Sequence, residues 1–515
     1  MLRRFLDRFA ERRGPAVFAA IVTLVLYCLV RYRDTVFLFF FLDDFWLMHS
    51  AAEIQGNSPT DLLAIFHPTH TGFQLYRPFT QVGYFYFLRQ LFEYDSSGYH
   101  AVQLLVYAVN TVLVFAITRK LTDSTLAAFA GGLLYATAPG HASAVFWVAA
   151  FTMSGTALTV FVLSLCWLYT RSVWRVVLCT LLQAIALLAS EHAVVGPFLL
   201  ALLWLLLPRR EPWRRAALAL APALLLVTGY LVLKLWYFSH VAAPSMGYTM
   251  WLDPLGWLER IGRYAAACVN ALTLVASGSR GWRVIGGLVL ALWLLSSWRA
   301  FRSGGPWTIV AGGLAMFLIG LLPVLPLRDH VYSYFIGIAA LGVVVALLGV
   351  CQLAGRHWRW IALALGLSVV TLDLATGQRA ARGDEIVQLI FAGAGAAANW
   401  VAGVQRAVVM RAPTRGALLP RDPTTEYVFG IGRAETYLPL MPPSVELYDF
   451  RRPPPALGEG EIMVAHPAWL RPGEPLPGWH ARWEWLRALA HGGAREPRQA
   501  QTVQPRGAAG ERLAR

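Results

Sequence analysis

Charged residues are scarce in this sequence. Asp, Glu, Lys and Arg make up only 14% of its 515 residues, whereas an ordinary soluble protein carries roughly 25%. Hydrophobic residues make up 57%, and they gather in long apolar runs. A chain of this composition is not a conventional soluble domain, so the sequence predicts a polytopic integral membrane protein.

Cysteine is also sparse. The five cysteines all lie in apolar stretches, and none has the spacing of a metal site: Cys28, Cys166, Cys179, Cys268 and Cys351. We therefore expect neither a disulfide framework nor a zinc centre. The sequence lacks a Walker-type phosphate loop, a Gly-x-Ser-x-Gly elbow and two similar halves. These absences count against ATP-driven transport, α/β-hydrolase chemistry and many secondary transporters.

The apolar runs predict an all-α bundle of about eleven membrane spans, within a range of roughly 10–13, because each crossing needs about 20 apolar residues. The expected spans are residues 15–31, 100–118, 124–138, 149–170, 174–190, 193–207, 216–237, 283–298, 306–326, 331–351 and 359–375. Two further helical stretches, 79–92 and 255–276, carry internal charge and are expected to lie at the membrane interface. If 255–276 crosses the bilayer instead, every later span is inverted.

Positive charge is in excess and follows a pattern typical of membrane proteins. The formal net charge is +15, which on a soluble protein would suggest nucleic acid. Here the basic residues cluster between apolar runs, as the positive-inside rule describes for cytoplasmic loops. The clusters are residues 1–13, Arg119-Lys120, Arg171/Arg175, Arg209-Arg210/Arg214-Arg215, Arg299/Arg302 and Arg356/Arg359. We therefore expect no nucleic-acid partner. We also expect an uncleaved first span, since no small-residue cleavage site follows it.

The composition changes along the chain and predicts three regions. Residues 1–375 form the transmembrane domain, whose first outer loop (32–99) is long enough to indicate a function. Residues 376–490 are expected to form a small soluble α/β appendage on the outer side, with a helix at 384–410. Residues 491–515 form a basic tail, rich in Gly and Ala, that is expected to be disordered.

The first outer loop begins with four Phe residues, followed by an adjacent pair of acids, Asp43-Asp44. Ionised carboxylates beside apolar side chains are costly to desolvate, so we expect the pair to have a task or a partner. Two adjacent acids also repel each other, which separates their pKa values. One can then stay ionised as a base while the other contacts an acceptor hydroxyl or a cation. The alternative is structural, because Asp is a good N-cap for the helix expected from about Phe45.

Three basic residues lie at the outer ends of apolar spans. Lys234 is near the end of the seventh span, and Arg328 and His330 lie just past the ninth. A cation at this depth suits a phosphate group delivered from the lipid side. The alternative is that each side chain extends to the interface to stay hydrated.

Further polar residues are candidates for a cavity wall or for acceptor contacts: Tyr76, Arg77, His100, His141 and Glu191. A lone His is more often structural, and Glu191 is equally compatible with an interfacial loop. The histidines of the outer loop match no standard ligand spacing, so we predict no metal site. The adjacent Asp43 and Asp44 leave Mg²⁺ or Mn²⁺ as the alternative.

Seven segments, in order along the chain, resemble the GT-C glycosyltransferases, in particular the protein O-mannosyltransferase-like branch, which includes bacterial relatives of the transmembrane TPR-containing mannosyltransferases. The segments are Leu42-Asp43-Asp44-Phe45, Tyr76-Arg77-Pro78-Phe79-Thr80, Gly98-Tyr99-His100-Ala101-Val102 with Asn110, His141-Ala142-Ser143-Ala144-Val145, Ser190-Glu191, Lys234-Leu235-Trp236 and Arg328 to Gly337. The resemblance covers roughly residues 15–375. It departs from the family pattern at Ala138, where relatives carry His, at Ser143, where they carry an acid, and at Asp329, which shifts the basic position.

The resemblance implies a GT-C fold and an inverting transfer of a hexose or pentose from a polyprenyl-phosphate donor to an acceptor hydroxyl. It implies that Asp43 is the general base and that Asp44 orients the acceptor. Lys234, with Arg328 or His330, would hold the donor phosphate. No cofactor is implied.

The expected setting is the outer face of a bacterial inner membrane. The partners are the lipid-linked donor, membrane lipid and a protein, lipid or polysaccharide acceptor. A transporter or flippase of lipid-linked sugars, or a non-catalytic assembly factor with the same fold, is the alternative function.

Overall fold

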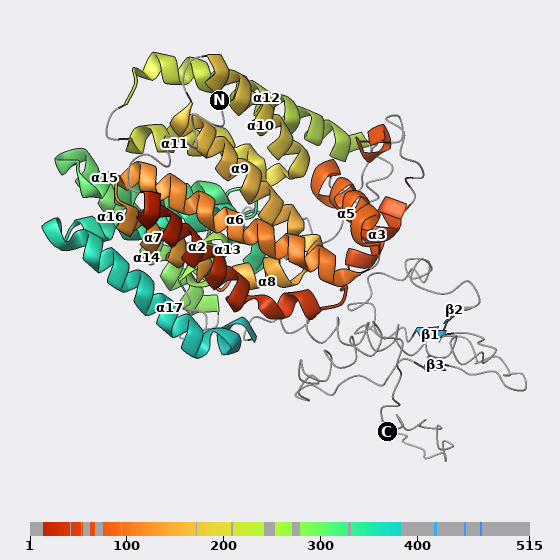
Figure 1. Ribbon diagram of the computed structural model, residues 1–515. Coiled ribbons are helices and arrows are strands. Elements are labelled where there is room, and N and C mark those ends of the chain that lie inside the picture. Colours follow the sequence, from red (N-terminus) through yellow and green to blue (C-terminus); the bar gives the residue numbers. More distant parts are fainter. Residues whose placement is uncertain are drawn as a thin grey trace, which may run out of the picture. The chain divides into compact units, whose positions relative to one another are not determined.

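Helices dominate the described part of the chain (Figure 1). The computed structural model describes residues 14–41, 43–52, 54, 62–66, 76–93, 95–170, 173–207, 210–240, 253–269, 279–327, 331–382, 417–419, 447–449 and 464–465. The apolar helices are α2 (Gly14–Arg31), α6 (Ser96–Thr122), α7 (Thr125–Ala136), α9 (Phe151–Tyr169), α10 (Val173–Ala189), α11 (Gly196–Leu206), α12 (Trp213–His240), α14 (Ser279–Ser303), α15 (Pro306–Leu321), α16 (Ile336–Gln352) and α17 (Trp358–Arg382). The short segments between them are η1 (Arg33–Phe37), α3 (Asp43–Ala52), η2 (Ala64–Phe66), η3 (Pro78–Gly83), α5 (Tyr84–Phe92), α8 (His141–Phe146), η4 (Val148–Ala150), η5 (Glu191–Val195), α13 (Pro254–Cys268), η7 (Ser333–Phe335) and η8 (Gly355–His357).

The number of apolar helices agrees with the sequence. Seven described helices are long and apolar enough to cross a membrane, and four shorter ones are also apolar. Together they coincide with the predicted spans, so the prediction of a polytopic helical membrane bundle is confirmed for the described residues. The interfacial stretch expected at 255–276 forms α13, which is 15 residues long and is not among the apolar helices. Its length and charge favour the interface over a crossing.

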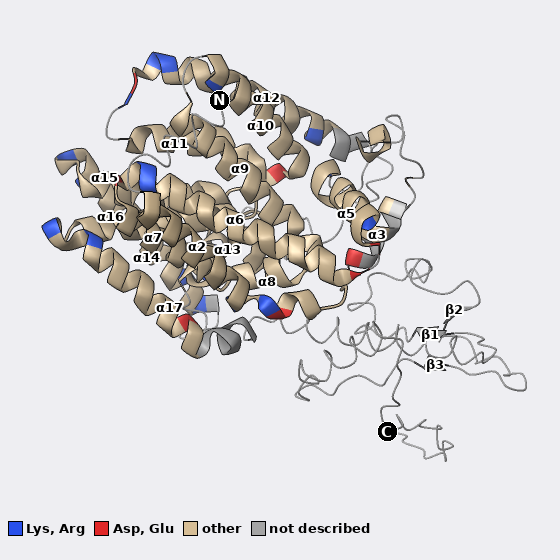
Figure 2. Cartoon of the chain, viewed as in Figure 1, with Lys and Arg blue, Asp and Glu red and all other residues tan. Residues whose placement is uncertain are grey.

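The basic clusters lie at one end of the bundle. When the apolar helices are numbered along the chain, every described cluster lies at the end of an even-numbered helix or at the beginning of an odd-numbered one. Examples are Arg119 and Lys120 at the end of α6 and Arg302 at the end of α14. In Figure 2, many of the blue positions on the long helices lie toward their left-hand ends. We call this end the basic face; residues 32–99 begin at the opposite face.

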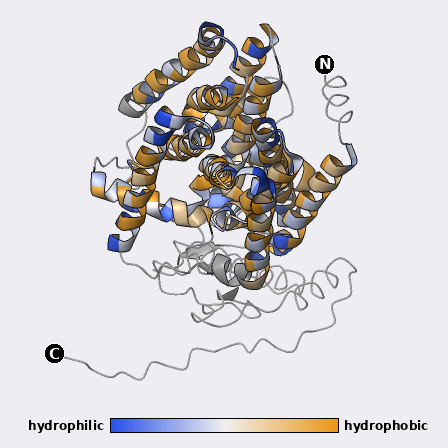
Figure 3. Cartoon of the chain, turned by 90° about the vertical axis from the view of Figure 1, so that its left-hand side faces the viewer, coloured by the Kyte–Doolittle hydropathy of each residue, from blue (hydrophilic) through white to orange (hydrophobic). Residues whose placement is uncertain are grey.

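Hydrophobic residues predominate along the helices of the bundle in Figure 3, and many of those on the peripheral helices are exposed. On α12, Leu218 and Leu225 are 74% and 72% exposed, and on α14 Leu288 is 63% exposed. Continuous apolar exposure of this kind does not persist in water. These faces therefore suit contact with lipid.

Glycines allow close packing where helix backbones meet. A Cβ atom added at Gly342 of α16 would lie 2.2 Å from the backbone N of Phe317 in α15. A Cβ added at Gly262 of α13 would lie 2.0 Å from the carbonyl oxygen of Trp282 in α14. Small residues at such contacts let helices associate without a polar interface.

A buried ion pair joins the first and last apolar helices. Arg31 Nε lies 2.6 Å from Asp373 Oδ2, with side-chain exposures of 7% and 1%, and Tyr27 OH donates to the same oxygen at 2.5 Å. Arg31 ends α2, and Asp373 lies near the end of the apolar part of α17. These two helix ends therefore share one membrane face, which is the face where residues 32–99 begin.

Replacing Asp373 with Asn is expected to destabilise the bundle by about 3 kcal/mol or more, because Arg31 then stays buried without its counter-ion. The measurement is the thermal unfolding of the purified protein in detergent. Glu259→Gln is the matched control, since it removes a carboxylate whose partners Arg263 and Arg283 are 45% and 39% exposed, and an exposed pair contributes only about 0–1 kcal/mol. Equal losses in the two variants would refute the role given to the buried pair.

Strands appear only in the C-terminal region of the described residues. β1 (Ala417–Leu419) pairs in parallel with β2 (Leu447–Asp449) and β3 (Val464–Ala465), in the order β2-β1-β3. The predicted helix at 384–410 and the tail at 491–515 lie outside the described residues. The division into domains at residues 375 and 490 stays a prediction.

Candidate active site

Asp44 is tied to the backbone through both carboxylate oxygens. Oδ2 accepts a hydrogen bond from Phe41 N at 2.8 Å, and Oδ1 accepts one from Ala149 N of η4 at 2.6 Å. The side chain is buried, with 1% exposure, and this burial raises the pKa of Asp44 well above its usual range against the two amide donors. Asp44 therefore fixes the start of α3 against η4. Asp44 therefore does more than cap the first turn of a helix, which was the structural alternative to a functional role.

Asp43 differs from its neighbour in being partly exposed. It is the first residue of α3, and desolvation by the surrounding protein raises the pKa of Asp43 to about 6. A carboxylate with this pKa is a stronger base than an ordinary Asp and is still mostly ionised at neutral pH. The acidic pair thus contains one anchored acid and one partly exposed acid.

Arg77 and Glu191 form a two-pronged ion pair. Arg77, which directly precedes η3, is 7% exposed. Its Nε donates to Glu191 Oε2 at 2.8 Å, and a second guanidinium nitrogen donates to Oε1. Thr80 of η3 reinforces the junction by donating to the carbonyl oxygen of Ala189, at the end of α10. The two segments, more than a hundred residues apart in sequence, are therefore held together at the face where α10 ends.

Lys234 joins this pair. It lies on α12 with 9% exposure, and its charge acts on Glu191 and Arg77. Its Nζ is 5.9 Å from the centre of the Tyr230 ring. We call Arg77, Glu191 and Lys234 the cationic cluster, because two cations and one carboxylate leave it positive. A largely buried positive excess is the electrostatic condition for binding an anion.

The structure groups these three residues differently from the sequence-based prediction. Arg77 and Glu191 were predicted on the acceptor side and Lys234 at the donor phosphate, whereas the structure brings all three together. The other predicted phosphate ligands, Arg328 and His330, lie outside the described residues. Sequence spacing could not reveal the cluster, because its members come from three separate segments.

The π-helix η3 connects the cationic cluster to the acidic pair. It follows Arg77 directly, and it packs against α3, α9 and α10. α3 begins with Asp43, and α10 ends two residues before Glu191. The helices that carry Asp43 and lead to Glu191 therefore both pack against one short element, at the face opposite the basic one.

The remaining candidates are structural in their contacts. His100 is fully buried, and its Nδ1 lies 3.2 Å from Thr35 Oγ1, which donates to the carbonyl oxygen of Val145. His141 is 2% exposed, with its ring centre 4.4 Å from that of Tyr135. Tyr76 OH donates to the carbonyl oxygen of Phe66 at 3.0 Å. None of these contacts brings the three side chains to Asp43.

A row of aromatic rings was not anticipated from the sequence. It runs Phe41, Trp147, Tyr334, Phe335 and His192, with ring centres separated by 6.0, 5.8, 4.6 and 5.0 Å along the row. The first member donates its backbone N–H to Asp44, and the last directly follows Glu191. The aromatic row therefore links the acidic pair to the cationic cluster. A sequence signal for the row did exist, because an aromatic ring lies next to each charged motif: Phe41 shortly before Asp43, and His192 directly after Glu191.

A metal centre gains no support from the described side chains. Among them, no group of three or more His, Cys, Asp or Glu residues comes close enough to hold an ion. Asp44 already uses both oxygens on backbone amides, which leaves Asp43 as the partly exposed carboxylate of the pair. Metal independence stays a prediction.

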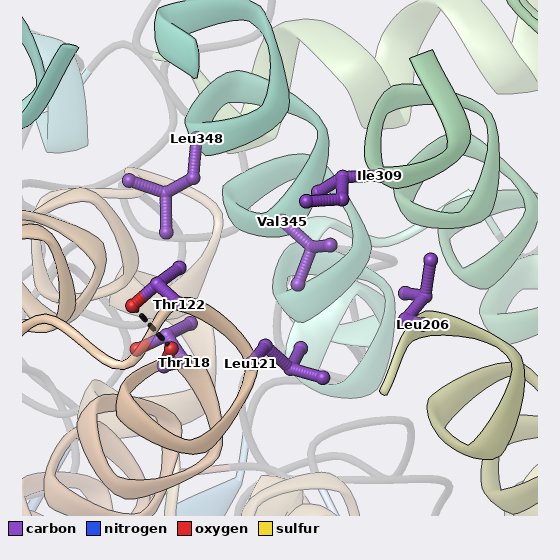
Figure 4. Close-up of a pocket in the computed structure, with 7 residues that line it drawn as sticks. All are labelled: Thr118, Leu121, Thr122, Leu206, Ile309, Val345 and Leu348. Carbon is purple, nitrogen blue, oxygen red and sulfur yellow. Dashed lines mark hydrogen bonds between the residues drawn. The ribbon is translucent and has the colours of Figure 1, made fainter. Parts of the chain in front are cut away.

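The pocket in Figure 4 lies away from these residues. Thr118, Leu121, Thr122, Leu206, Ile309, Val345 and Leu348 line it. These residues lie near the ends of α6, α11 and α16 and the beginning of α15, which is the basic face. The Thr122 hydroxyl donates a hydrogen bond to the carbonyl oxygen of Thr118 at 2.8 Å. The pocket is small and apolar and contains no candidate residue.

Comparison with known proteins gives only distant structural likeness. No family model matches the sequence, and no curated protein matches it. The chain is similar to the cryo-EM structure of the arabinofuranosyltransferase AftD from mycobacteria, with a TM-score of 0.43 and 14% identity. The likeness covers 84% of this chain and 31% of that one, so this chain spans about a third of the length of that enzyme.

Proposed function

We propose that this chain is an inverting membrane glycosyltransferase. It would move a sugar from a polyprenyl-phosphate donor to an acceptor hydroxyl, on the outer face of a bacterial inner membrane. One observation carries the proposal, namely that η3, which follows Arg77 directly, packs against α3, whose first residue is the partly exposed, raised-pKa Asp43. A base and an anion site on one membrane face are what this reaction requires.

Asp43 and the cationic cluster act on different atoms in the proposed reaction. Asp43 accepts the proton of the acceptor hydroxyl, whose oxygen attacks the anomeric carbon on the side opposite the phosphate. The bond between that carbon and the phosphate oxygen breaks, its electron pair stays on the phosphate, and the configuration inverts. Because the leaving phosphate is a stable anion, the protein needs no general acid. The cationic cluster stabilises the negative charge that grows there.

Asp44 takes a different role from the one the family resemblance implies. Both of its oxygens accept backbone hydrogen bonds, so we assign it to positioning Asp43 instead of contacting the acceptor. Arg77 likewise moves from the acceptor side to the donor phosphate, beside Lys234. On the acceptor side, this leaves the partly exposed Asp43.

The test is a transfer assay with membranes that contain the full chain. A labelled farnesyl-phosphate sugar is supplied, with mannose, glucose, galactose and arabinofuranose each tested. We expect label to become covalently attached to an acceptor in the membrane for at least one sugar. Movement of intact donor across the bilayer without attachment would favour the transporter. No attachment and no movement would favour the assembly factor.

The pH dependence of transfer should report the Asp43 carboxyl. Its pKa is raised to about 6, and only the ionised form can accept a proton, so transfer should be lost as pH falls through about 6 and reach a plateau above about 7. The measurement is the initial rate between pH 4.5 and 8.5. The assay contains saturating donor and includes a check that the protein stays folded at each pH. A rate that stays flat down to pH 4.5 would exclude Asp43 as the base.

A further inference from the structure

We infer that Tyr332 and Tyr334 form a platform that binds the sugar ring of the lipid-linked donor. The inference rests on the proposed function and assigns one part of the donor to a specific surface. It arises from the aromatic row, because the row spans the interval between the acidic pair and the cationic cluster. The sugar is the part of the donor that lies between the attacking oxygen and the phosphate, so it belongs in that interval.

Exposure distinguishes Tyr334 from the other members of the row, and Tyr332 stacks on Tyr334 from outside the row. Trp147 and Phe335 are 8% and 6% exposed, so their rings are covered by protein. Tyr332 and Tyr334 are partly exposed. Their rings stack on each other at 5.2 Å with planes only 24° apart. These two rings therefore still offer surface to a ligand.

The platform is held rigidly. Ser333, between the two tyrosines, has its Oγ 2.8 Å from Ser143 Oγ of α8. The ring of Trp147 packs edge-on against Tyr334, and Trp147 Nε1 donates to the carbonyl oxygen of Phe41 at 3.3 Å. The platform is thereby fixed relative to the chain that leads into Asp43. A surface that does not rearrange loses little entropy when it binds.

The chemistry of the pair fits a sugar. One face of a pyranose or furanose ring presents C–H groups that pack on an aromatic ring, while its hydroxyls need hydrogen-bonding partners. A tyrosine supplies both an apolar ring and a phenolic O–H. A phosphate or a polyprenyl chain needs only one of these properties. The cationic cluster suits the phosphate, and the exposed apolar face of α12 suits the lipid tail.

Binding of a matched ligand pair tests the platform. The ligands are farnesyl phosphate alone and the same lipid linked to each of the four sugars, titrated onto the purified full chain in nanodiscs. For the sugar that wild type binds best, Tyr334→Ala should weaken binding by about tenfold. The same variant should bind farnesyl phosphate itself like wild type. Tyr334→Phe keeps the ring and should lose less than Tyr334→Ala.

Tyr169→Ala serves as the control. Tyr169 is also partly exposed, but it ends α9 at the basic face, so its loss should leave both ligands unaffected. If Tyr334→Ala weakens both ligands equally, or neither, the platform is refuted. If wild type prefers none of the sugar-linked lipids over farnesyl phosphate, the donor class in the proposed function fails instead. Retained binding of farnesyl phosphate by the variant shows at the same time that it is folded.

Discussion

Replacing Asp43 with Asn is expected to lower sugar transfer by roughly 100-fold to 10,000-fold. Asn has nearly the same shape but cannot accept the proton of the acceptor hydroxyl. Because the donor phosphate is bound elsewhere, the Kd for farnesyl phosphate should stay close to that of wild type. The measurement is the initial transfer rate at pH 7.5, together with an equilibrium titration of the lipid.

Two other carboxylates make the Asp43 result specific. Asp34 lies in η1 of the same outer loop with a side chain that is 43% exposed, so Asp34→Asn should keep the wild-type rate. Asp44→Asn replaces one backbone-accepting oxygen with an amide donor, so it should lower the rate and the thermal stability together. If Asp43→Asn keeps more than about a tenth of the wild-type rate, the base lies elsewhere.

The second large effect is expected at Arg77. Arg77→Gln leaves Glu191, whose side chain is 22% exposed, without its bidentate partner, which should cost about 2 kcal/mol of stability. It should also weaken farnesyl phosphate binding. These two effects need to be separated, because any destabilised variant binds its ligands less well.

The double variant Arg77→Gln/Glu191→Gln separates them. With both charges removed, most of the lost stability should return. Binding of farnesyl phosphate should still be weaker than wild type by about tenfold, because a charge-assisted contact to phosphate is missing. Thermal unfolding and lipid titration are measured on the same samples. If the double variant binds the lipid like wild type, Arg77 serves only to hold Glu191.

An ion pair at the basic face supplies the matched control. Arg175 and Glu211 are also paired, with side-chain exposures of 11% and 28%. Their double Gln variant should change stability only slightly and leave lipid binding unchanged. A similar loss of lipid binding in this variant would show that any removed pair perturbs the site.

Membrane crossing is the part of the fold that the sequence predicts best. Hydrocarbon thickness requires a run of apolar residues, and such runs are visible without any tertiary information. A helix within 255–276 was also foreseen and is present as α13; its place at the interface stays a prediction, made because charge within an amphipathic stretch opposes crossing. Strand pairing in the C-terminal region was less accessible, since each strand is only two or three residues long.

The candidate site was predictable only in part. Asp43 and Asp44 stood out because adjacent acids beside aromatic residues are costly, yet their division of labour depends on the backbone amides of Phe41 and Ala149. The latter lies more than a hundred residues away. The partnership of Arg77, Glu191 and Lys234 likewise depends on how η3, η5 and α12 meet. Contacts between distant segments are set by packing, which no local spacing encodes.

The Arg31–Asp373 pair also has a consequence for how the protein is made. The two residues are 342 positions apart, and at a synthesis rate of about 5–20 residues per second the second emerges roughly 20–70 seconds after the first. During that interval Arg31 is already at the membrane surface without its final partner, where water or a lipid head group can solvate it. The pair closes only after the last helix has entered the bilayer. The first helix therefore reaches its final environment only after α17 has been inserted.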